Sequence, residues 1–294
     1  MAILVTALAL GRDARPRALA DSALSLVALA LVLSGSGEGD QWSPYHRISV
    51  VRPGGGDAAL LVNGIPHQAM HPVNVDGPAA EPFYDQVYQW FPQRRFSRAL
   101  IVGAGSGTDV AYALVRGVGA VDAVEIDPGI RRIGQREHPD QPYADARVHA
   151  HVNDGRAFLR STDARYELIV FALPDSLTLV STTANIRLES YLFTREAFAS
   201  ARDRLAPGGI FVLYNCYRQP WLLQEIDAML ADVFRSSPLV RQYEASIGSA
   251  AVLAVLSDPL SASGATALDL VGAPAPATDD WPFLYLRDRE IASY

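Results

Sequence analysis

The feature that most constrains the fold is an alternation that runs from residue 98 to residue 256. Short apolar runs, rich in Val, Ile, Leu and Phe, alternate with segments whose apolar residues recur at helical spacing. Strands that alternate with helices over short connections predict a doubly wound, mostly parallel α/β sheet. Ligands of such sheets bind beyond the carboxyl ends of the strands, so we expect the functional residues in the loops that follow them.

The expected elements of this region can be given as residue ranges. We expect strands within 98–105, 120–127, 147–154, 166–173, 210–215 and 249–257. We expect helices within 108–117, 128–137, 155–162, 194–205 and 221–234, and a further helix within 81–91.

Residues 42–75 have a different character. Apolar and β-branched residues lie on both sides of the glycine-rich stretch 52–57, a pattern that predicts two strands joined as a hairpin. We therefore expect a small N-terminal β module at 42–75, a Rossmann-like domain at 76–260, and a C-terminal connector and tail at 261–294.

Residues 1–41 form an N-terminal segment with two apolar runs, 1–10 and 22–35. Neither run reaches the roughly 18 residues expected of a membrane span. We expect this segment to pack onto the domain as a helix or strand, with a peripheral membrane contact through residues 1–40 as the alternative.

Composition excludes several classes of function. A net charge of -7 argues against a nucleic-acid surface, and all 25 basic residues are arginine, so the chain has no Walker or Schiff-base lysine. The single cysteine, Cys216, excludes an internal disulfide and a cysteine metal cluster. His149 and His151 alternate as in a strand, but no third ligand accompanies them, so we expect no metal. We expect a cytoplasmic protein.

A glycine loop follows the first strand of the alternating region. The stretch "VGAGSGTD" places Gly103, Gly105 and Gly107 before a helix for which Thr108 is a plausible N-cap. Glycines there let the backbone approach a ligand and leave helix N–H groups available. The spacing is G-x-G-x-G, and Glu125 ends the next strand, where an acid suits ribose hydroxyls. The alternative is a tight turn without ligand, with Glu125 as a solvated acid.

Two further stretches favour an S-adenosylmethionine (AdoMet) site. "NDGRAF" puts Asp154 and Gly155 after the third strand, where an acid suits an adenine amino group, and "LAPGGIFVLY" provides a turn into a later strand. Together with "VEIDPGI", these stretches resemble the AdoMet-dependent methyltransferase fold. The alternative for Asp154 is a helix cap. Asp127 is expected to cap its helix.

Within that fold, the chain resembles the spermidine synthase family, the polyamine aminopropyltransferases. The resemblance covers roughly residues 42 to 256 and rests on "SPYHRISVV", "LLVNGIPHQ", "EPFYDQ" and the core from "RALIVGAGSGTDV" to "YELIVFAL". It implies transfer of an aminopropyl group from decarboxylated AdoMet to a diamine such as putrescine, with methylthioadenosine as by-product. It also implies a possible homodimer.

The resemblance assigns roles by position. It implies that Glu125 binds the donor ribose and that Asp154 and Gly155 face the adenine. Gly103 and Gly105 would lie against the donor. Gln68 and Tyr84 would belong to the donor or acceptor pocket.

The chain also departs from the family pattern. Ala172 stands where the family has its proposed base, and Ser106 replaces the acid of the glycine loop. Asp175 matches a second family acid and is expected to contact ligand, with a role as base as the alternative. Asp109 and Asp85 are available to restore negative charge.

These departures leave more than one function open. A spermidine synthase-like transferase is the first reading. The alternatives are an enzyme of the same fold that uses ordinary AdoMet for methyl transfer or cyclisation, and a non-catalytic protein that binds a nucleoside sulfonium.

Overall fold

The computed structural model describes residues 24–26, 39–54, 57–74, 81–172, 188–217, 219–244, 249–257, 275–282 and 284. The chain divides into two compact units, Met1–Gln41 and Trp42–Tyr294. In the first unit, residues 24–26 are helical and exposed, and the expected packing of residues 1–41 otherwise falls outside the described residues. Over the described ranges, no helix combines the length and the apolar character that crossing a bilayer requires.

The second unit begins with a small sheet of four strands, in the order β1-β2-β3-β4. Its strands are β1 (Gln41–Trp42), β2 (Arg47–Gly54), β3 (Asp57–Val62) and β4 (Ile65–Met70). Both the β2–β3 and β3–β4 pairs are antiparallel. The predicted hairpin around the glycine-rich stretch is confirmed as β2 and β3, whereas β1 and β4 were not predicted as separate strands. Asn63 and Gly64, with φ of 53° and 82°, turn the chain between β3 and β4, and an Asn-Gly pair accepts positive φ at low cost.

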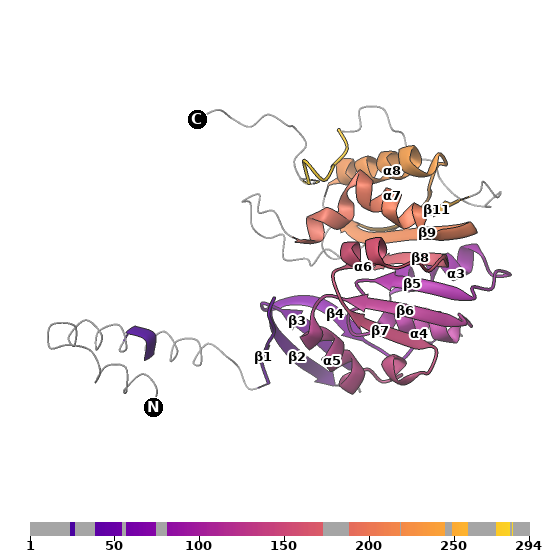
Figure 1. Cartoon of the computed structure of the whole chain (residues 1–294). Helices are drawn as coiled ribbons and strands as arrows, with labels where there is room; N and C mark the ends of the chain where they lie inside the picture. Colours follow the sequence, from indigo (N-terminus) through magenta and orange to yellow (C-terminus); the bar gives the residue numbers. More distant parts are fainter. Residues whose placement is uncertain are drawn as a thin grey trace. The chain divides into compact units, whose positions relative to one another are not determined.

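This small sheet packs its apolar face against helix α5 (Pro128–Glu137), as Figure 1 shows. The buried residues of this contact come from both partners and are Ile48, Ala58, Leu60, Val62, Met70, Ile130 and Ile133. Burying an aliphatic side chain of this size contributes about 1.5–3 kcal/mol. The sheet is therefore fixed to the rest of the unit by a separate apolar cluster.

The large sheet has seven strands in the order β10-β11-β9-β8-β5-β6-β7. Its strands are β5 (Arg98–Val102), β6 (Ala120–Glu125), β7 (Val148–Val152), β8 (Tyr166–Ala172), β9 (Leu205–Tyr217), β10 (Leu239–Glu244) and β11 (Ser249–Leu256). The pairs among β5 to β9 are parallel, whereas β11 pairs antiparallel with both β9 and β10. The predicted doubly wound, mostly parallel sheet with a small β module is confirmed; strand β10 was not predicted.

Helices cover both faces of this sheet. One face packs against α6 (Gly155–Ser161), α7 (Arg195–Asp203) and α8 (Pro220–Phe234). The other packs against the short helix η1 (Pro82–Tyr84), α3 (Gln86–Trp90) and α4 (Thr108–Val115). Alternation along β5 divides its side chains between the two cores, with Ala99 and Ile101 on the α4 side. Two further short helices are η2 (Pro142–Ala144) and η3 (Leu188–Phe193).

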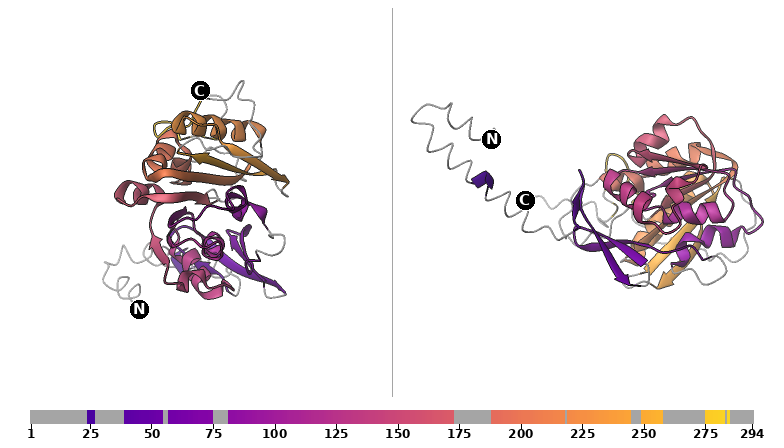
Figure 2. Two further views of the ribbon diagram at one scale, coloured as in Figure 1. Left: turned by 90° about the vertical axis from the view of Figure 1, so that its right-hand side faces the viewer. Right: turned by 90° about the horizontal axis from the view of Figure 1, so that it is seen from below.

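The strand order places the expected ligand site between β5 and β8. From β5 the chain continues to β6 and β7 on one side, and then crosses back so that β8 pairs with the other side of β5. A crevice forms at such a reversal, beyond the carboxyl ends of the two strands. In both views of Figure 2 the small sheet lies to one side of the large one.

Candidate active site

The glycine loop after β5 is held against the end of β6. The N–H groups of Gly103 and Ala104 donate to the carbonyl of Val124 at 2.9 and 3.0 Å. The Gly105 N–H donates to Glu125 Oε2 at 2.9 Å. Gly105 has φ of 55°, a conformation that favours glycine, and an added Cβ would lie 2.4 Å from Gln68 Oε1, so another residue would force the Gln68 side chain to move.

Gln68 connects the small sheet to this loop. Its Oε1 accepts hydrogen bonds from the backbone N–H of Ser106 at 2.8 Å and from the Ser106 hydroxyl at 2.9 Å.

The prediction that Thr108 is the N-cap of α4 is wrong. Gly107, with φ of 101°, occupies the N-cap position of α4, and Thr108 is the first helical residue. The loop reaches the helix only through a left-handed residue, which glycine provides.

Glu125 is buried, with 7% of its surface exposed. Besides the Gly105 N–H, its carboxylate accepts the Asp127 N–H at 2.8 Å. Burial raises the pKa of Glu125, and the two backbone hydrogen bonds oppose that shift. The carboxylate thus joins the glycine loop to the start of α5. Ribose binding by Glu125 stays a prediction.

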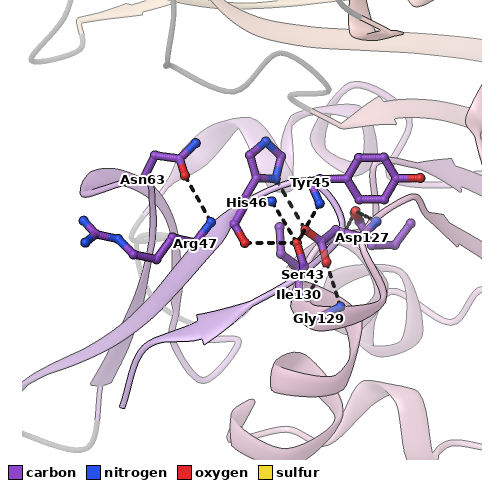
Figure 3. A network of polar contacts seen from close by, with 10 residues as sticks. Ser43, Tyr45, His46, Arg47, Asn63, Asp127, Gly129 and Ile130 are labelled. Atoms are coloured by element: carbon purple, nitrogen blue, oxygen red, sulfur yellow. Dashed lines mark hydrogen bonds and ion pairs between the residues drawn. The ribbon is translucent and has the colours of Figure 1, made fainter. Parts of the chain in front are cut away.

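Asp127 caps α5, as the sequence predicts. It accepts the N–H groups of Gly129 and Ile130 at 2.7 and 3.4 Å. Its second carboxylate oxygen accepts the Ser43 hydroxyl at 2.5 Å and lies 3.4 Å from His46 Nδ1 (Figure 3). Although burial opposes ionisation, these hydrogen bonds lower the pKa of Asp127. One carboxylate therefore caps the helix and anchors the start of the small sheet.

Asp154 and Gly155 begin helix α6. Asp154 caps it by accepting the Ala157 N–H at 2.8 Å, so the alternative role as a helix cap is confirmed. A Cβ on Gly155 would lie 2.3 Å from Val102 Cγ1, so this glycine lets α6 lie directly on β5. The adenine contact expected of both residues stays a prediction.

A polar pocket lies at the carboxyl ends of β5, β8 and β9, in the expected crevice. It has a volume of about 30 Å³, enough for at least one water molecule. Its lining residues are His67, Gln68, Tyr84, Gly103, Gly105, Asp109, Ala172 and Tyr214. The structure thus gathers Gln68, Tyr84, Gly103 and Gly105 around one cavity. Gly107, Asp154 and Gly155 lie outside its lining.

Aromatic rings form one wall of this pocket. The Tyr84 ring stacks on Tyr112 at 5.6 Å and meets Tyr214 edge-on at 5.9 Å. Phe83 packs on Tyr214 at 5.1 Å. Burial raises the pKa of Tyr84 well above its ordinary value, so its hydroxyl stays protonated at neutral pH. Tyr84 therefore packs its ring against neighbouring aromatic residues and also lines the pocket.

Asp109, which the sequence analysis names with Asp85 as an acid available to restore negative charge, lines the pocket. Its side chain is buried, and the Tyr214 hydroxyl donates a hydrogen bond to Oδ1. Burial raises the pKa of Asp109 to about 7. Acids are common in the first turn of a helix because they interact favourably with the helix dipole. The sequence alone therefore does not indicate that Asp109 is buried in a pocket.

Asp85 does not supply free charge to the pocket, contrary to the sequence expectation. Its carboxylate forms a bidentate ion pair with Arg116, at 2.7 Å to Nε and 2.6 Å to Nη2. The Gln89 amide also donates to it at 3.0 Å. Asp85 therefore joins α3 to the end of α4.

A second cavity, of about 130 Å³, adjoins the first and shares Tyr84 with it. It is lined by His71, Pro72, Asn74, Glu81, Tyr84, Thr108 and Tyr112. Burial raises the pKa of Glu81. After burial, the nearby Glu81 carboxylate also raises the pKa of Asp109.

Other candidates from the sequence have different positions. Asp175 lies outside the described residues. His151 Nε2 lies 2.9 Å from Asp122 Oδ1, and Arg98 also pairs with Asp122, so this histidine belongs to a polar cluster on β6 and β7. Within the described ranges, no three His, Cys, Asp or Glu side chains are grouped as metal ligands.

Comparison with known proteins decides the family. The model of the spermine/spermidine synthase domain matches residues 90–255, more than half of the chain. The chain belongs to the spermine/spermidine synthase family. The match covers β5 to β9 and the glycine loop, together with most of the pocket lining.

Individual relatives are similar to the chain in sequence, and solved structures are similar to it in fold. A polyamine aminopropyltransferase of Nitrosomonas europaea is 31% identical over 183 residues, which make up 58% of this chain. The chain spans only about half of that relative, 53% of its length. A probable spermidine synthase from Corynebacterium glutamicum, at 17% identity, matches the fold with a TM-score of 0.59 over 78% of this chain and 83% of its own. A spermidine synthase in complex with the transition state analogue AdoDATO, at 14% identity, has a TM-score of 0.58 over 74% and 71% of the two chains.

Proposed function

We propose that this spermine/spermidine synthase family member moves an aminopropyl-type group from decarboxylated AdoMet to an amine. The observation that supports the proposal best is the polar pocket at the reversal of strand order. There Gln68, Tyr84 and the glycine loop surround one cavity together with a buried carboxylate. A sulfonium donor is already activated, so a site that orients donor and amine can supply much of the rate.

The residues near the pocket fit a cationic nucleoside. Gly103 and Gly105 present backbone without side chains, and two carboxylates, Glu125 and Asp109, are buried nearby. Buried negative charge favours binding of a positive sulfonium. In this proposal Glu125 binds the ribose, Asp154 and Gly155 bind the adenine, and Gln68 and Tyr84 enclose the reacting end.

The reaction would be a direct displacement. The amine nitrogen attacks the carbon bonded to sulfur, the C–N bond forms, and the C–S bond breaks. Sulfur keeps the electron pair and leaves as the neutral thioether of methylthioadenosine. The nitrogen loses one proton to a carboxylate. Asp175, three residues after Ala172, is proposed to contact the ligands beside this centre.

The test is mass spectrometry of donor turnover. Purified protein is incubated separately with AdoMet and with decarboxylated AdoMet, each with and without putrescine. The proposal expects methylthioadenosine and spermidine from decarboxylated AdoMet only when putrescine is present. S-adenosylhomocysteine from AdoMet, or methylthioadenosine from AdoMet alone, would replace it with methyl transfer or cyclisation. Absence of all products would reject transfer between this donor and putrescine.

The proposal extends to the setting of the protein. It includes a small amine as acceptor, a cytoplasmic location and a homodimer. Size-exclusion chromatography with light scattering tests the dimer, which a monomer mass of 31.7 kDa would contradict.

A further inference from the structure

The pocket lacks an acid on β8 but has one on α4. Ala172, at the end of β8, contributes only a methyl group to the lining, at the position where the family resemblance expects a carboxylate. Asp109, from the first turn of α4, lines the same cavity and is 6% exposed. The cavity therefore has a carboxylate on a different wall.

Two other buried aspartates contrast with Asp109. Asp85 is neutralised by Arg116, and Asp122 is neutralised by Arg98, in each case through two guanidinium hydrogen bonds. Among the residues that the structure describes, no arginine or histidine lies within ion-pair distance of the Asp109 carboxylate. A buried carboxylate without a cation is costly unless it is protonated or meets a cationic ligand.

The groups around Asp109 provide no positive charge at neutral pH. The titratable groups that face it are Glu81, Tyr84, Tyr88, Tyr112, Tyr143 and Tyr214, together with His67 on the pocket wall. Burial raises the pKa values of the tyrosines, so they remain neutral. Burial beside His46 lowers the pKa of His67 to about 4, so its imidazole is also neutral.

We infer that Asp109 and Glu81 form the amine-acceptor site, in which Asp109 holds the attacking ammonium and takes its proton. This inference rests on the proposed function and specifies its acceptor as an amine with at least one further ammonium group. The attacking nitrogen gives its proton to Asp109 and its electron pair to the new C–N bond, as the C–S pair leaves with sulfur. Glu81, in the adjoining cavity, binds the second ammonium.

Tyr214 is a positioning residue for this step. Its hydroxyl donates to Asp109 Oδ1, which fixes the carboxylate and favours its ionised form. Asp109 accepts a proton only when ionised, and its pKa is raised by burial to about 7. Turnover should therefore rise with pH through about 7. Tyr214→Phe removes the hydrogen bond and should move that rise to higher pH, a change that a purely structural role would not produce.

The experiment compares variants of the full chain with decarboxylated AdoMet and putrescine. Asp109→Asn keeps the shape and should lower kcat about 100-fold or more. Glu81→Gln should raise the KM for putrescine about 10-fold and leave kcat largely unchanged. Asp163→Asn is the matched control, because this carboxylate is fully exposed, and its kinetics should equal those of the wild type.

Each outcome separates the inference from the proposed function. If the wild type forms spermidine and Asp109→Asn does so at an equal rate, the Asp109 assignment is wrong while the transferase proposal stands. If the wild type forms no product, calorimetry of putrescine binding in the presence of methylthioadenosine decides. Binding that Asp109→Asn abolishes supports the amine site, whereas equal binding to both proteins, or none to the wild type, overturns it. Circular dichroism and the Tm of each variant confirm that it is folded.

Discussion

Gln68 on β4 accepts both hydrogen-bond donors of Ser106, its backbone N–H and its hydroxyl, through a single oxygen. This contact joins two segments that lie 38 residues apart. Because Ser106 occupies the centre of the glycine loop, the small sheet helps to set the position of the loop that lines the pocket.

Gln68→Ala should therefore weaken donor binding. Each lost hydrogen bond costs about 1 kcal/mol, so the Kd for methylthioadenosine should rise by roughly 10-fold or more. Calorimetry measures the change, with the exposed Gln135→Ala on α5 as control. Equal affinity in the two variants would mean that Gln68 does not organise the donor site.

Glu125→Gln should destabilise the fold as well as the site. The carboxylate accepts backbone N–H groups from both Gly105 and Asp127, and an amide can offer only one acceptor oxygen to them. One buried N–H then faces an NH₂ group, at a cost of about 1–3 kcal/mol. Thermal unfolding should show a Tm lower by several degrees, and added methylthioadenosine should no longer raise it. An unchanged Tm would contradict the two-bond geometry.

Ser43→Ala and Asp127→Ala should show coupled effects. Loss of the Asp127 cap costs about 0.5–2 kcal/mol, and loss of the Ser43 hydrogen bond costs about another 1 kcal/mol. Since both residues share one contact, the double variant should lose less stability than the sum of the single ones. Urea unfolding of the four proteins measures this coupling, and strict additivity would argue against the contact.

The same pair predicts a response to acid. Its hydrogen bonds lower the pKa of Asp127 below that of the unfolded chain. The stability that this group contributes is thus present above the unfolded pKa near 4, and it is lost as pH falls through the lower folded value. Replacing Ser43 should reduce the loss of stability on acidification below pH 4. The measurement is Tm as a function of pH for wild type and Ser43→Ala.

Asp227 on α8 predicts the opposite pH dependence. Its side chain is buried, its Oδ1 has no hydrogen-bond partner, and burial raises its pKa to about 6. Because the folded pKa lies above the unfolded one, the stability that this group contributes is complete below the unfolded pKa. It is lost as the pH rises through the folded pKa of about 6. Asp227→Asn should therefore gain about 1–2 kcal/mol over the wild type at pH 8 and little at pH 4. A gain that does not depend on pH, or one also found in the exposed Asp163→Asn, would count against ionisation as the cause.

Periodicity was sufficient to predict the large sheet because its strands are apolar runs and its helices have apolar stripes. It failed where polar residues form strands. The sequence of β10, "LVRQYE", has exposed charged positions and no apolar run, yet it pairs along β11 through its backbone. The Asn63-Gly64 pair is typical of a hairpin turn. It lies between two apolar segments that together resemble one continuous strand, so β3 and β4 were not predicted as separate strands.

The candidate site was predictable only in part. The family resemblance identified Gln68 and Tyr84, and the spacing of the glycine loop identified Gly103 and Gly105; the structure gathers all four around one pocket. Asp109 and Tyr214 are 105 residues apart, and their contact depends on how β9 lies beside β8 in the sheet. A local sequence pattern carries no information on such a contact. Asp175 and its ligand role remain a prediction.

The apolar cluster between the small sheet and α5 has a consequence for biosynthesis. The strands β2 to β4 are complete at Met70, but their partner Ile130 follows 60 residues later. At about 5–20 residues per second, a ribosome needs roughly 3–12 s to supply it. During that interval Ile48, Leu60 and Met70 have no helix to cover them. We expect the nascent chain to depend on chaperones at this stage, with release of the bound chaperone once α5 emerges.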